Sequence, residues 1–185
     1  ASAPAATLSD VAFGEVLLCS GQSNMAYQLQ QTAEWPLIVN DTAYWDTPDL
    51  RLLSFAPSVA GWWPADNRSV APAFSAICYF AGRDLLARLG VPVGLVASSV
   101  GGTPIECWTR AEVVATCPDA VANNQTLDGA GNLFEAWIRP LAPMALRAVL
   151  WDQGEQNMVP NSPLVQATGA SLWRAYACMF PAMID

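Results

Sequence analysis

The stretch Gly14-Glu-Val-Leu-Leu-Cys-Ser-Gly-Gln-Ser-Asn-Met25 decides most of what this sequence predicts. Its apolar run, Val16 to Cys19, has the length and composition of a buried strand. The run stops at Ser20-Gly21, small residues that suit a tight turn, and a serine follows at position 23. Ligands of open α/β sheets bind at the carboxyl edge of the strands. The segment therefore predicts that Ser23 presents its hydroxyl at such an edge, as a candidate nucleophile.

The same segment has an alternative interpretation that needs no catalysis. Serine is common in turns and at helix N-caps directly after strands. Ser20 and Ser23 fit those roles as well, so this segment alone leaves both interpretations open.

Two further segments share the pattern of an apolar run followed by glycine and small polar residues. They are Val93 to Trp108, which contains Gly101-Gly102, and Ala145 to Asn157, which contains Gln153-Gly154. The strand Val93 to Ala97 follows a helix-compatible run, an order that predicts parallel pairing. We expect the three segments to end at one edge of one sheet.

Together the three segments resemble the SGNH hydrolases and, within them, the sialate O-acetylesterase family. That family carries a Gly-Gln-Ser-Asn-Met block, a Ser-Ser-Trp-Gly-Gly-Thr-Pro-Ile-Glu block and a Trp-Tyr-Gln-Gly-Glu-Ser-Asn block. Here the blocks are Gly21 to Met25, Ser98 to Glu106 and Trp151 to Asn157. The resemblance implies a three-layer α/β/α fold with a doubly wound parallel sheet.

Three positions depart from the family blocks. Val100 replaces a Trp, Asp152 a Tyr and Gln156 a Ser. The change at Val100 removes an aromatic wall and is expected to reshape the acyl pocket. The other two changes flank the expected oxyanion loop and bear on its geometry.

The resemblance assigns roles to individual residues. It makes Ser23 the nucleophile and places its backbone N–H in the oxyanion hole. Gly102, or its neighbour Gly101, supplies a second backbone donor, because glycine lets the main chain approach a substrate closely. A side-chain amide completes the hole, and both Gln153 and Asn157 are candidates, with Gln153 preferred. Three further side chains, Asn24, Glu106 and Glu155, are expected to brace the loops.

The chain contains no histidine, and this absence limits the mechanism. A serine hydroxyl needs a base within hydrogen-bond reach. All eight basic residues are arginines, which do not give up a proton in proteins. The family is thought to place its base in an Asp-x-x-His pair downstream of the third block. Either residues 1–185 are part of a longer esterase domain that continues past Phe180-Pro-Ala-Met-Ile-Asp185, or the chain has lost catalysis; we expect the former.

The expected function is hydrolysis of acetyl esters on sugars through an acetyl-Ser23 intermediate, with sialic acid as the first choice of sugar. No cofactor and no metal are expected. The alternatives are a noncatalytic carbohydrate-binding protein of the same fold, an acetylxylan-type esterase, or a serine hydrolase whose base lies on a partner chain. The side chains of four tryptophans are candidates for stacking on a sugar, although core packing is the commoner role: Trp35, Trp62, Trp63 and Trp108.

Composition excludes several classes of partner. The formal net charge is −8, which argues against nucleic acid and against anionic membranes. No apolar run reaches the roughly 18 residues of a membrane span. With 53% hydrophobic residues and eight Trp, the chain can bury a large core.

Five cysteines and three glycosylation sequons indicate the secretory route, either secreted or lysosomal. The sequons begin at Asn40, Asn67 and Asn124. Cys107 and Cys117 are close enough in sequence to suggest a disulfide. Two further cysteines, Cys19 and Cys78, lie in apolar surroundings and are interpreted as small buried hydrophobic residues.

The remaining elements are predicted from hydrophobic periodicity and from the positions of helix- and strand-ending residues. Strands are expected at Glu15–Cys19, Arg51–Phe55, Val93–Ala97 and Leu146–Trp151, and the clearest helix at Ala73–Leu89. Loops are expected at Pro57–Pro72 and Asn123–Asn132, short helical turns at Thr109–Ala115, and a helix-compatible run within Pro163–Met179.

Overall fold

The fold is built on one five-stranded sheet. The computed structural model describes residues 7–55, 60–117, 120, 130–158 and 172–184. The strand order is β3-β2-β4-β1-β5. The strands are β1 (Glu15–Gly21), β2 (Leu50–Ser54), β3 (Gly61–Pro64), β4 (Val93–Ser99) and β5 (Ala148–Asp152). Strands β2, β4, β1 and β5 are parallel, and the edge strand β3 is antiparallel to β2.

The α/β fold class predicted from the sequence is confirmed, and one strand was missed. The segment Gly61-Trp-Trp-Pro64 was expected inside a loop, but it pairs with β2 across Ser54↔Gly61 to Arg51↔Pro64. Its glycine and proline hid the strand signal. Both are tolerated because β3 is an edge strand, where proline need not donate to a further neighbour.

Helix α4 (Ala76–Leu89) is the longest in the described chain and begins three residues later than predicted. Ser75 is its N-cap, because its side chain accepts a hydrogen bond from the Cys78 backbone N–H. Gly90 ends the helix in the left-handed conformation at φ 64°. In mid-helix, Gly82 faces β4 so closely that an added Cβ would lie 2.5 Å from the Leu95 side chain.

The other helical segments are short, apart from the last. They are α1 (Ser23–Ala26), η1 (Leu29–Gln31), α2 (Trp35–Ile38), α3 (Thr42–Trp45), η3 (Ala71–Ala73), α5 (Ile105–Trp108), α6 (Ala111–Val114), η4 (Phe134–Ile138), η5 (Arg139–Leu141), η6 (Glu155–Met158) and α9 (Leu172–Ile184). The expected loop at Asn123–Asn132 and the start of the expected C-terminal helix lie mostly outside the described residues.

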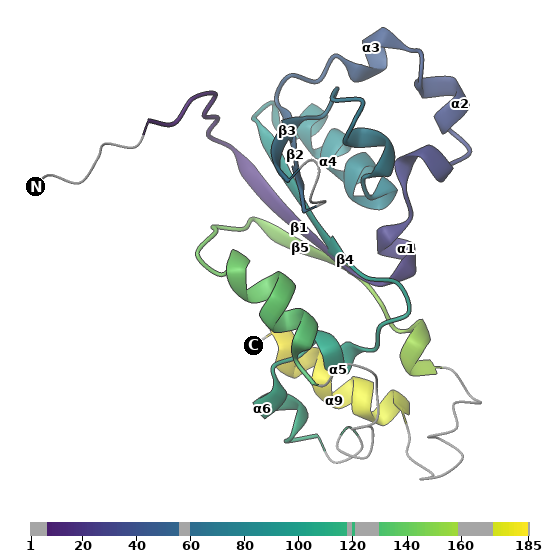
Figure 1. Ribbon diagram of the computed structural model, residues 1–185, viewed down its shortest axis with the longest axis vertical. Helices are drawn as coiled ribbons and strands as arrows, with labels where there is room; N and C mark the ends of the chain where they lie inside the picture. The colour runs from purple at the N-terminus through teal and green to yellow at the C-terminus, as the bar shows by residue number, and fades with distance from the viewer. Residues whose placement is uncertain (1–6, 56–59, 118–119, 121–129, 159–171, 185) are drawn as a thin grey trace, which may run out of the picture.

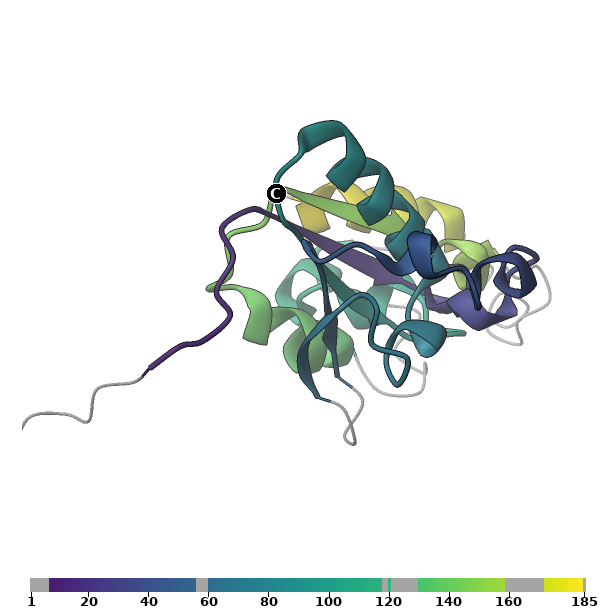
Figure 2. The ribbon, with the colours of Figure 1, turned by 90° about the horizontal axis from the view of Figure 1, so that it is seen from above.

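The helices cover the sheet on both sides. Helix α4 and the segment that carries α1 to α3 lie on one side, which we call the α4 face (Figure 1). On the other side lie α5, α6, η4, η5 and α9, which form the α9 face (Figures 1 and 2). Strand β1 shows the alternation between the two: Leu17 packs in the core cluster of the α4 face, and Leu18 packs in a cluster of the α9 face with Leu141.

Two disulfides overturn the cysteine pairing expected from the sequence. Cys19 bonds Cys78 and joins β1 to α4. Cys117 bonds Cys178 rather than Cys107, and it joins the segment after α6 to α9. Sequence proximity misled the prediction, because the fold brings together residues 59 and 61 positions apart. The apolar surroundings of Cys19 and Cys78 were read correctly, since both are fully buried, but they form a bond.

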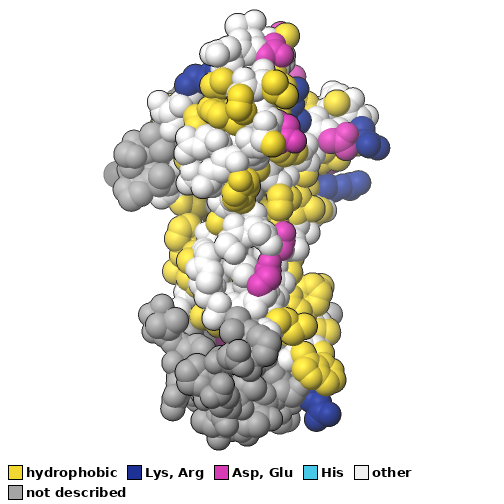
Figure 3. All heavy atoms as spheres, turned by 90° about the vertical axis from the view of Figure 1, so that its right-hand side faces the viewer, with side chains coloured by type: hydrophobic (Ala, Val, Ile, Leu, Met, Phe, Trp, Pro, Cys, Tyr) yellow, Lys and Arg dark blue, Asp and Glu magenta, His cyan; other side chains and the backbone are white. Residues whose placement is uncertain are grey.

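Charged side chains are dispersed over the described surface. Among the described residues, ion pairs join Arg51 to Asp10, Arg88 to Asp84, Arg110 to Glu112 and Arg139 to Glu135. On the side of the molecule in Figure 3, acidic and basic groups lie in small clusters, and some acidic groups lie next to basic ones. Within the described residues, the helices all fall short of the length and apolar character needed to cross a membrane.

Candidate active site

Three loops at the carboxyl edge of the sheet form the candidate site. They follow β1, β4 and β5, which are neighbours in the sheet. The first loop carries Ser23, the second Gly101 and Gly102, and the third Gln153 and Asn157. The structure therefore brings together the segments that the sequence predicted would meet.

Gly21 fixes where the first loop turns. Its φ is 144°, and an added Cβ would lie 2.0 Å from the Asp152 carbonyl oxygen, so only glycine fits here. The next residue, Gln22, donates its backbone N–H to the same Asp152 oxygen at 2.9 Å. The Gly21 carbonyl accepts from the Val100 N–H at 3.1 Å. The end of β1 is thus fastened to both neighbouring strands.

Ser23 lies exposed just beyond this fixed point, as the first residue of α1. Its Oγ takes no hydrogen-bond partner among the described residues. Gly101 lies directly against it, because an added Cβ there would be 3.6 Å from the Ser23 Cβ. Its neighbour Gly102 has φ 74°, and an added Cβ would meet nothing within 4 Å. A reacting group at Ser23 would therefore lie beside the glycine main chain.

A buried amide network ties the three loops together. The Gln153 Nε2 lies within hydrogen-bond distance of Gln22 Oε1 (3.2 Å), the Thr103 carbonyl oxygen (3.1 Å) and Asn157 Oδ1 (2.8 Å). These three acceptors belong to the three different loops. Because an amide nitrogen carries two hydrogens, the Gln153 Nε2 has no hydrogen left for another acceptor. The Gln153 Oε1, by contrast, is buried and has no partner among the described residues.

Asn157 and Glu106 form the most deeply buried part of the network. Asn157 is buried, its Oδ1 accepts from the Ile105 backbone N–H at 2.9 Å, and its Nδ2 donates to Glu106 Oε2 at 2.8 Å. Glu106 is also buried. The expected bracing role of Glu106 agrees with this contact, whereas Asn157 shows the same bracing contacts rather than a free amide. The oxyanion roles of Gln153 and Asn157 stay predictions.

Asn24 links the first loop, which carries Ser23, to the third loop at the surface. Its Nδ2 donates to the carboxylate of Glu155, and both side chains are exposed. This contact is the one expected of residues that brace loops.

Sequence reasoning missed three residues that shape the site. Gln22 is buried, and its Oε1 also accepts from the Gln156 backbone N–H at 3.3 Å. Thr103 accepts from Trp108 Nε1 at 2.9 Å, and it donates to the Val100 carbonyl at 2.7 Å. The signal for both was their position inside the first two blocks.

Tyr176 of α9 is the third such residue. Its hydroxyl donates to the Gln153 carbonyl oxygen at 2.9 Å and accepts from Trp151 Nε1 at 3.2 Å. Burial raises the pKa of the Tyr176 hydroxyl, and the nearby carboxylates of Glu155 and Asp152 raise it further against the opposing effect of Trp151. The hydroxyl therefore keeps the proton that holds the third loop.

The four candidate tryptophans do not surround Ser23. Trp108 is buried under the second loop. Trp35 stands edge-on to Trp45 beside the α4-face core, and Trp63 packs against the same core. Trp62 is exposed, but it contacts Gly94 near the start of β4, at the opposite end of the strand from the site.

Comparison with known proteins identifies relatives of this arrangement. The carbohydrate esterase, sialic acid-specific acetylesterase family matches residues 14–166. The chain is 33% identical over 198 residues to sialate O-acetylesterase of Homo sapiens, with 95% of this chain and 35% of the relative covered. It is 34% identical over 227 residues to that of Rattus norvegicus, covering 95% of this chain and 39% of the relative.

A solved structure shares the fold. A carbohydrate acetylesterase from Xanthomonas citri superimposes with a TM-score of 0.66 at 28% identity, covering 92% of this chain and 38% of that one. The chain thus spans between about a third and two fifths of the length of these relatives, 35% and 39% for the curated proteins.

Proposed function

This chain belongs to the carbohydrate esterase family of sialic acid-specific acetylesterases, and we propose that it supplies the nucleophile and the oxyanion hole for removing O-acetyl groups from sugars. The observation that carries the proposal is the placement of Ser23. Its hydroxyl is exposed and unpartnered among the described residues, on a loop fastened to both neighbouring strands and directly against Gly101. A positioned hydroxyl beside a glycine main chain suits attack on an ester carbonyl.

The reaction is acyl transfer to water in two steps. The Ser23 Oγ attacks the acetyl carbonyl carbon while a base takes the hydroxyl proton, and the tetrahedral intermediate carries its charge on the carbonyl oxygen. Collapse of the intermediate breaks the ester bond, and the sugar hydroxyl leaves with a proton. Water then attacks the acetyl-Ser23, and acetate is released.

The oxyanion donors in this proposal are the backbone N–H groups of Ser23 and Gly102. Removing one such donor typically costs on the order of 10²–10³ in rate. Gln153 and Asn157 are the predicted side-chain donors. To act as one, Gln153 would have to exchange one of its present contacts for the oxyanion, and the contact with Gln22 at 3.2 Å is the longest.

The base in this proposal comes from outside these 185 residues. The chain has no histidine, and its basic residues are all arginine. Glu155, one of the two acidic residues of the third block, already accepts a hydrogen bond from Asn24. A base from another segment or chain would approach the exposed Ser23 from solvent.

The proposed substrate is an O-acetylated sialic acid, supported by the names of the family and of the mammalian relatives. An acetylated xylan is the alternative among sugars. The secretory route is supported by two disulfides and by sequons such as the one at the exposed Asn40. The third sequon, at Asn124, lies outside the described residues.

A second candidate function is binding of acetylated sugars without turnover. The specific observation in its favour is the lack of any histidine or lysine in the chain. The two candidates share the fold and the site, and they differ in whether acetate is released.

The test is acetate release from an O-acetylated sialic acid and from 4-nitrophenyl acetate by the protein as it occurs. We expect turnover, and we expect Ser23→Ala to lower kcat by at least about a thousandfold because the covalent route is lost. Ser9→Ala, which changes an exposed serine ahead of β1 that belongs to no sequon, is the matched control and should leave kcat unchanged.

Two results would contradict the esterase. Retained turnover in Ser23→Ala would remove Ser23 as the nucleophile. Saturable binding of the acetylated sugar with no acetate release would instead establish the noncatalytic function.

A further inference from the structure

Helix α9 reaches the third loop of the candidate site through the side chain of Tyr176. Its hydroxyl donates to the Gln153 carbonyl oxygen at 2.9 Å and accepts from Trp151 Nε1 at 3.2 Å. Its ring lies beside Gly154, where an added Cβ would be 4.0 Å from Tyr176 Cε2. Gly154 has φ 152°, a conformation that favours glycine, so the loop turns at this residue. Tyr176 therefore contacts both the end of β5 and the turn that follows it.

The residue that accepts this hydrogen bond is also the one that joins the three loops. The Gln153 Nε2 lies between 2.8 and 3.2 Å from acceptors on the first, second and third loops. A side-chain amide keeps such contacts only while its own main chain stays in place. A shift of the Gln153 main chain would move the amide relative to Ser23, and a misplacement of about 1 Å can cost on the order of 10² in rate.

A disulfide fastens α9 two residues beyond Tyr176. Cys178 of α9 bonds Cys117, which follows α6. Cys117 is buried in one cluster with Ala175 and Met179 of the helix, whereas Cys178 is exposed. Because an α-helix has 3.6 residues per turn, the bond fixes the helix within one turn of the tyrosine.

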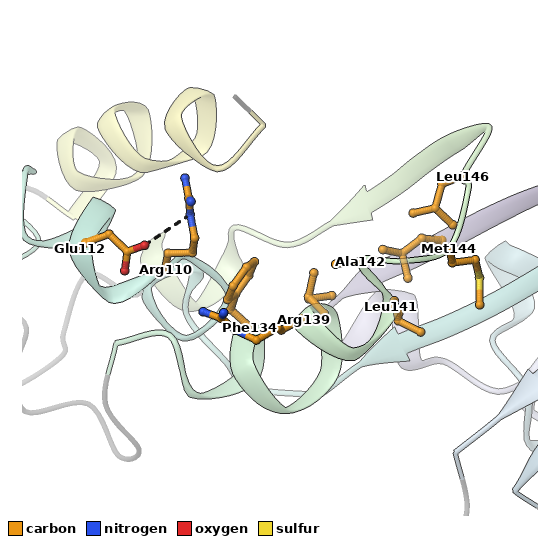
Figure 4. A pocket seen from close by; sticks show the side chains of 10 residues that line it. Arg110, Glu112, Phe134, Arg139, Leu141, Ala142, Met144 and Leu146 are labelled. Atoms are coloured by element: carbon orange, nitrogen blue, oxygen red, sulfur yellow. Dashed lines mark ion pairs between the residues drawn. The ribbon is translucent and has the colours of Figure 1, made fainter. Parts of the chain in front are cut away.

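Side-chain packing beside α9 leaves two hollows, so the disulfide has a larger part in holding the helix. The last turn of α9 borders a cavity of about 480 Å³, and Ile184 there is 68% exposed. A second hollow on the same face, of about 380 Å³, is lined in part by Arg110, Phe134 and Arg139 (Figure 4). A helix next to such hollows has room to move once its covalent anchor is removed.

We propose that Tyr176 is a positioning residue for the reaction at Ser23, and that the Cys117–Cys178 bond holds Tyr176 in place. This inference rests on the proposed function, because it assigns a role in that reaction. Tyr176 acts through Gln153 and does not touch the substrate. Loss of its hydroxyl or of the disulfide frees the third loop, which slows the chemical step and leaves the binding of the sugar unchanged.

The first test is the kinetics of acetyl ester hydrolysis by the protein as it occurs, with 4-nitrophenyl acetate and an O-acetylated sialic acid. For Tyr176→Phe we expect kcat to fall about two- to tenfold, the usual worth of one hydrogen bond, with KM within about twofold. Tyr79→Phe is the matched control. It removes a tyrosine hydroxyl on the α4 face that has no hydrogen-bond partner among the described residues, and it should leave kcat unchanged.

The second test removes the disulfide. Cys117→Ala/Cys178→Ala should lower kcat by a similar factor, and adding Tyr176→Phe should lower it no further, because both changes release the same contact. Dithiothreitol gives the same comparison without a substitution, at a concentration that leaves the Cys19–Cys78 bond intact. Its two thiols reduce the bond to two cysteine thiols and close into a cyclic disulfide. The kcat of the unaltered chain should then fall, and that of Tyr176→Phe should not.

A third measurement needs no substrate. The Trp151 indole N–H donates to the Tyr176 hydroxyl, whereas the Trp45 indole N–H donates to a backbone carbonyl on the α4 face at 2.7 Å. In the NMR spectrum, the Trp151 signal should move in Tyr176→Phe and also in the variant without the Cys117–Cys178 bond. The Trp45 signal should stay where it is in both variants.

Three results would overturn the proposal: an unchanged kcat in Tyr176→Phe, kcat losses that multiply when the two changes are combined, or an unmoved Trp151 signal in the variant without the disulfide. Failure of the proposed function is a separate outcome, shown by retained turnover in Ser23→Ala. The Trp151 signal would then still decide whether the disulfide holds the third loop.

Discussion

The two faces of the sheet differ in how densely their side chains are packed. On the α4 face, one continuous cluster of buried side chains runs from β1 to the aromatic group of Trp45 and Tyr79, and a fully buried disulfide crosses it. On the α9 face, two smaller clusters are separated by cavities of about 380 and 480 Å³. The η4 segment there contributes no buried residue.

The difference shows how the candidate site is held. Strand β1, which leads into the turn before Ser23, is anchored through Cys19 and Leu17 to the densely packed face. The second and third loops rest on Trp108 and Tyr176, which belong to the looser face. The Ser23 loop is thus fixed by the core, and the remaining parts of the site depend on the amide network around Gln153.

The largest expected effect comes from the two disulfides, which form a matched pair. Their sequence separations are 59 and 61, so the loop-entropy contribution to stability is about 4 kcal/mol for each. Cys19→Ala/Cys78→Ala should lower the free energy of unfolding more than Cys117→Ala/Cys178→Ala, because both sulfurs of the first pair are fully buried and their loss leaves a void. Urea unfolding of the two double variants measures the difference.

The order in which a mild reductant opens the two disulfides gives a second measurement of the same contrast. Cys178 is exposed, whereas Cys19 and Cys78 are both buried. The bond between Cys117 and Cys178 should therefore be reduced first. Earlier reduction of the Cys19–Cys78 bond would contradict the contrast between the faces. An equal loss of unfolding free energy in the two double variants would contradict it as well.

A smaller effect separates two adjacent leucines of β1. Leu17 and Leu18 are buried to nearly the same degree, 5% and 4% exposed, but they point to opposite faces. Leu to Ala substitutions cost about 2–5 kcal/mol, depending on how well the site can relax. Leu17→Ala should lie near the top of that range. Leu18→Ala should lie near the bottom, because Leu18 already borders both cavities.

Thermal and urea unfolding of the two single variants measures this difference. The two variants lose the same side chain from the same strand at nearly the same degree of burial, so only the packing of the two faces differs. Equal losses would show that the cavities are filled in solution.

The smallest effect concerns Tyr79, the buried aromatic residue at the centre of the α4 face. Its hydroxyl has no hydrogen-bond partner among the described residues, so Tyr79→Phe should change stability at pH 7 by less than about 1 kcal/mol. Burial, with a smaller contribution from Tyr44, raises the pKa of Tyr79 to about 12 against the opposing effects of Arg83 and Arg68. The folded state thus favours the neutral phenol.

The sign of the pH dependence follows. Stability due to the neutral Tyr79 is intact below the unfolded pKa of about 10 and is lost as the pH rises toward 12. Between these pH values, the free energy of unfolding should fall less steeply with pH in Tyr79→Phe than in the unaltered chain. An unchanged slope would mean that the phenol ionises without cost and that this face is less tightly packed than the structure shows.

Much of the site edge was predictable because its signals are local. The apolar run before Ser20-Gly21 marks β1, and the glycines of the three blocks mark where the main chain turns. Gly21 bears this out at φ 144° against the Asp152 carbonyl. Edge strand β3 was missed because Gly61 and Pro64 read as loop residues without knowledge of their neighbour β2.

The contacts between blocks were not predictable in the same way. Gln22 and Gln153 are 131 residues apart, and nothing in either segment shows that their side chains meet. Asn157 was read as an oxyanion donor from its place in the third block. The structure shows that its amide contacts Glu106 and the Ile105 backbone, which are buried and need partners, and the oxyanion role stays a prediction.

The sequence by itself determined the strand that carries Ser23, the glycine turn beside it, the family and the lack of a histidine base, since each is read from a few consecutive residues or from composition. The tertiary structure alone decided which cysteines pair, how Gln153 joins the three loops and where the cavities of the α9 face lie. Those features depend on which buried groups from distant segments share space, and burial leaves each polar group to find a partner or remain without one.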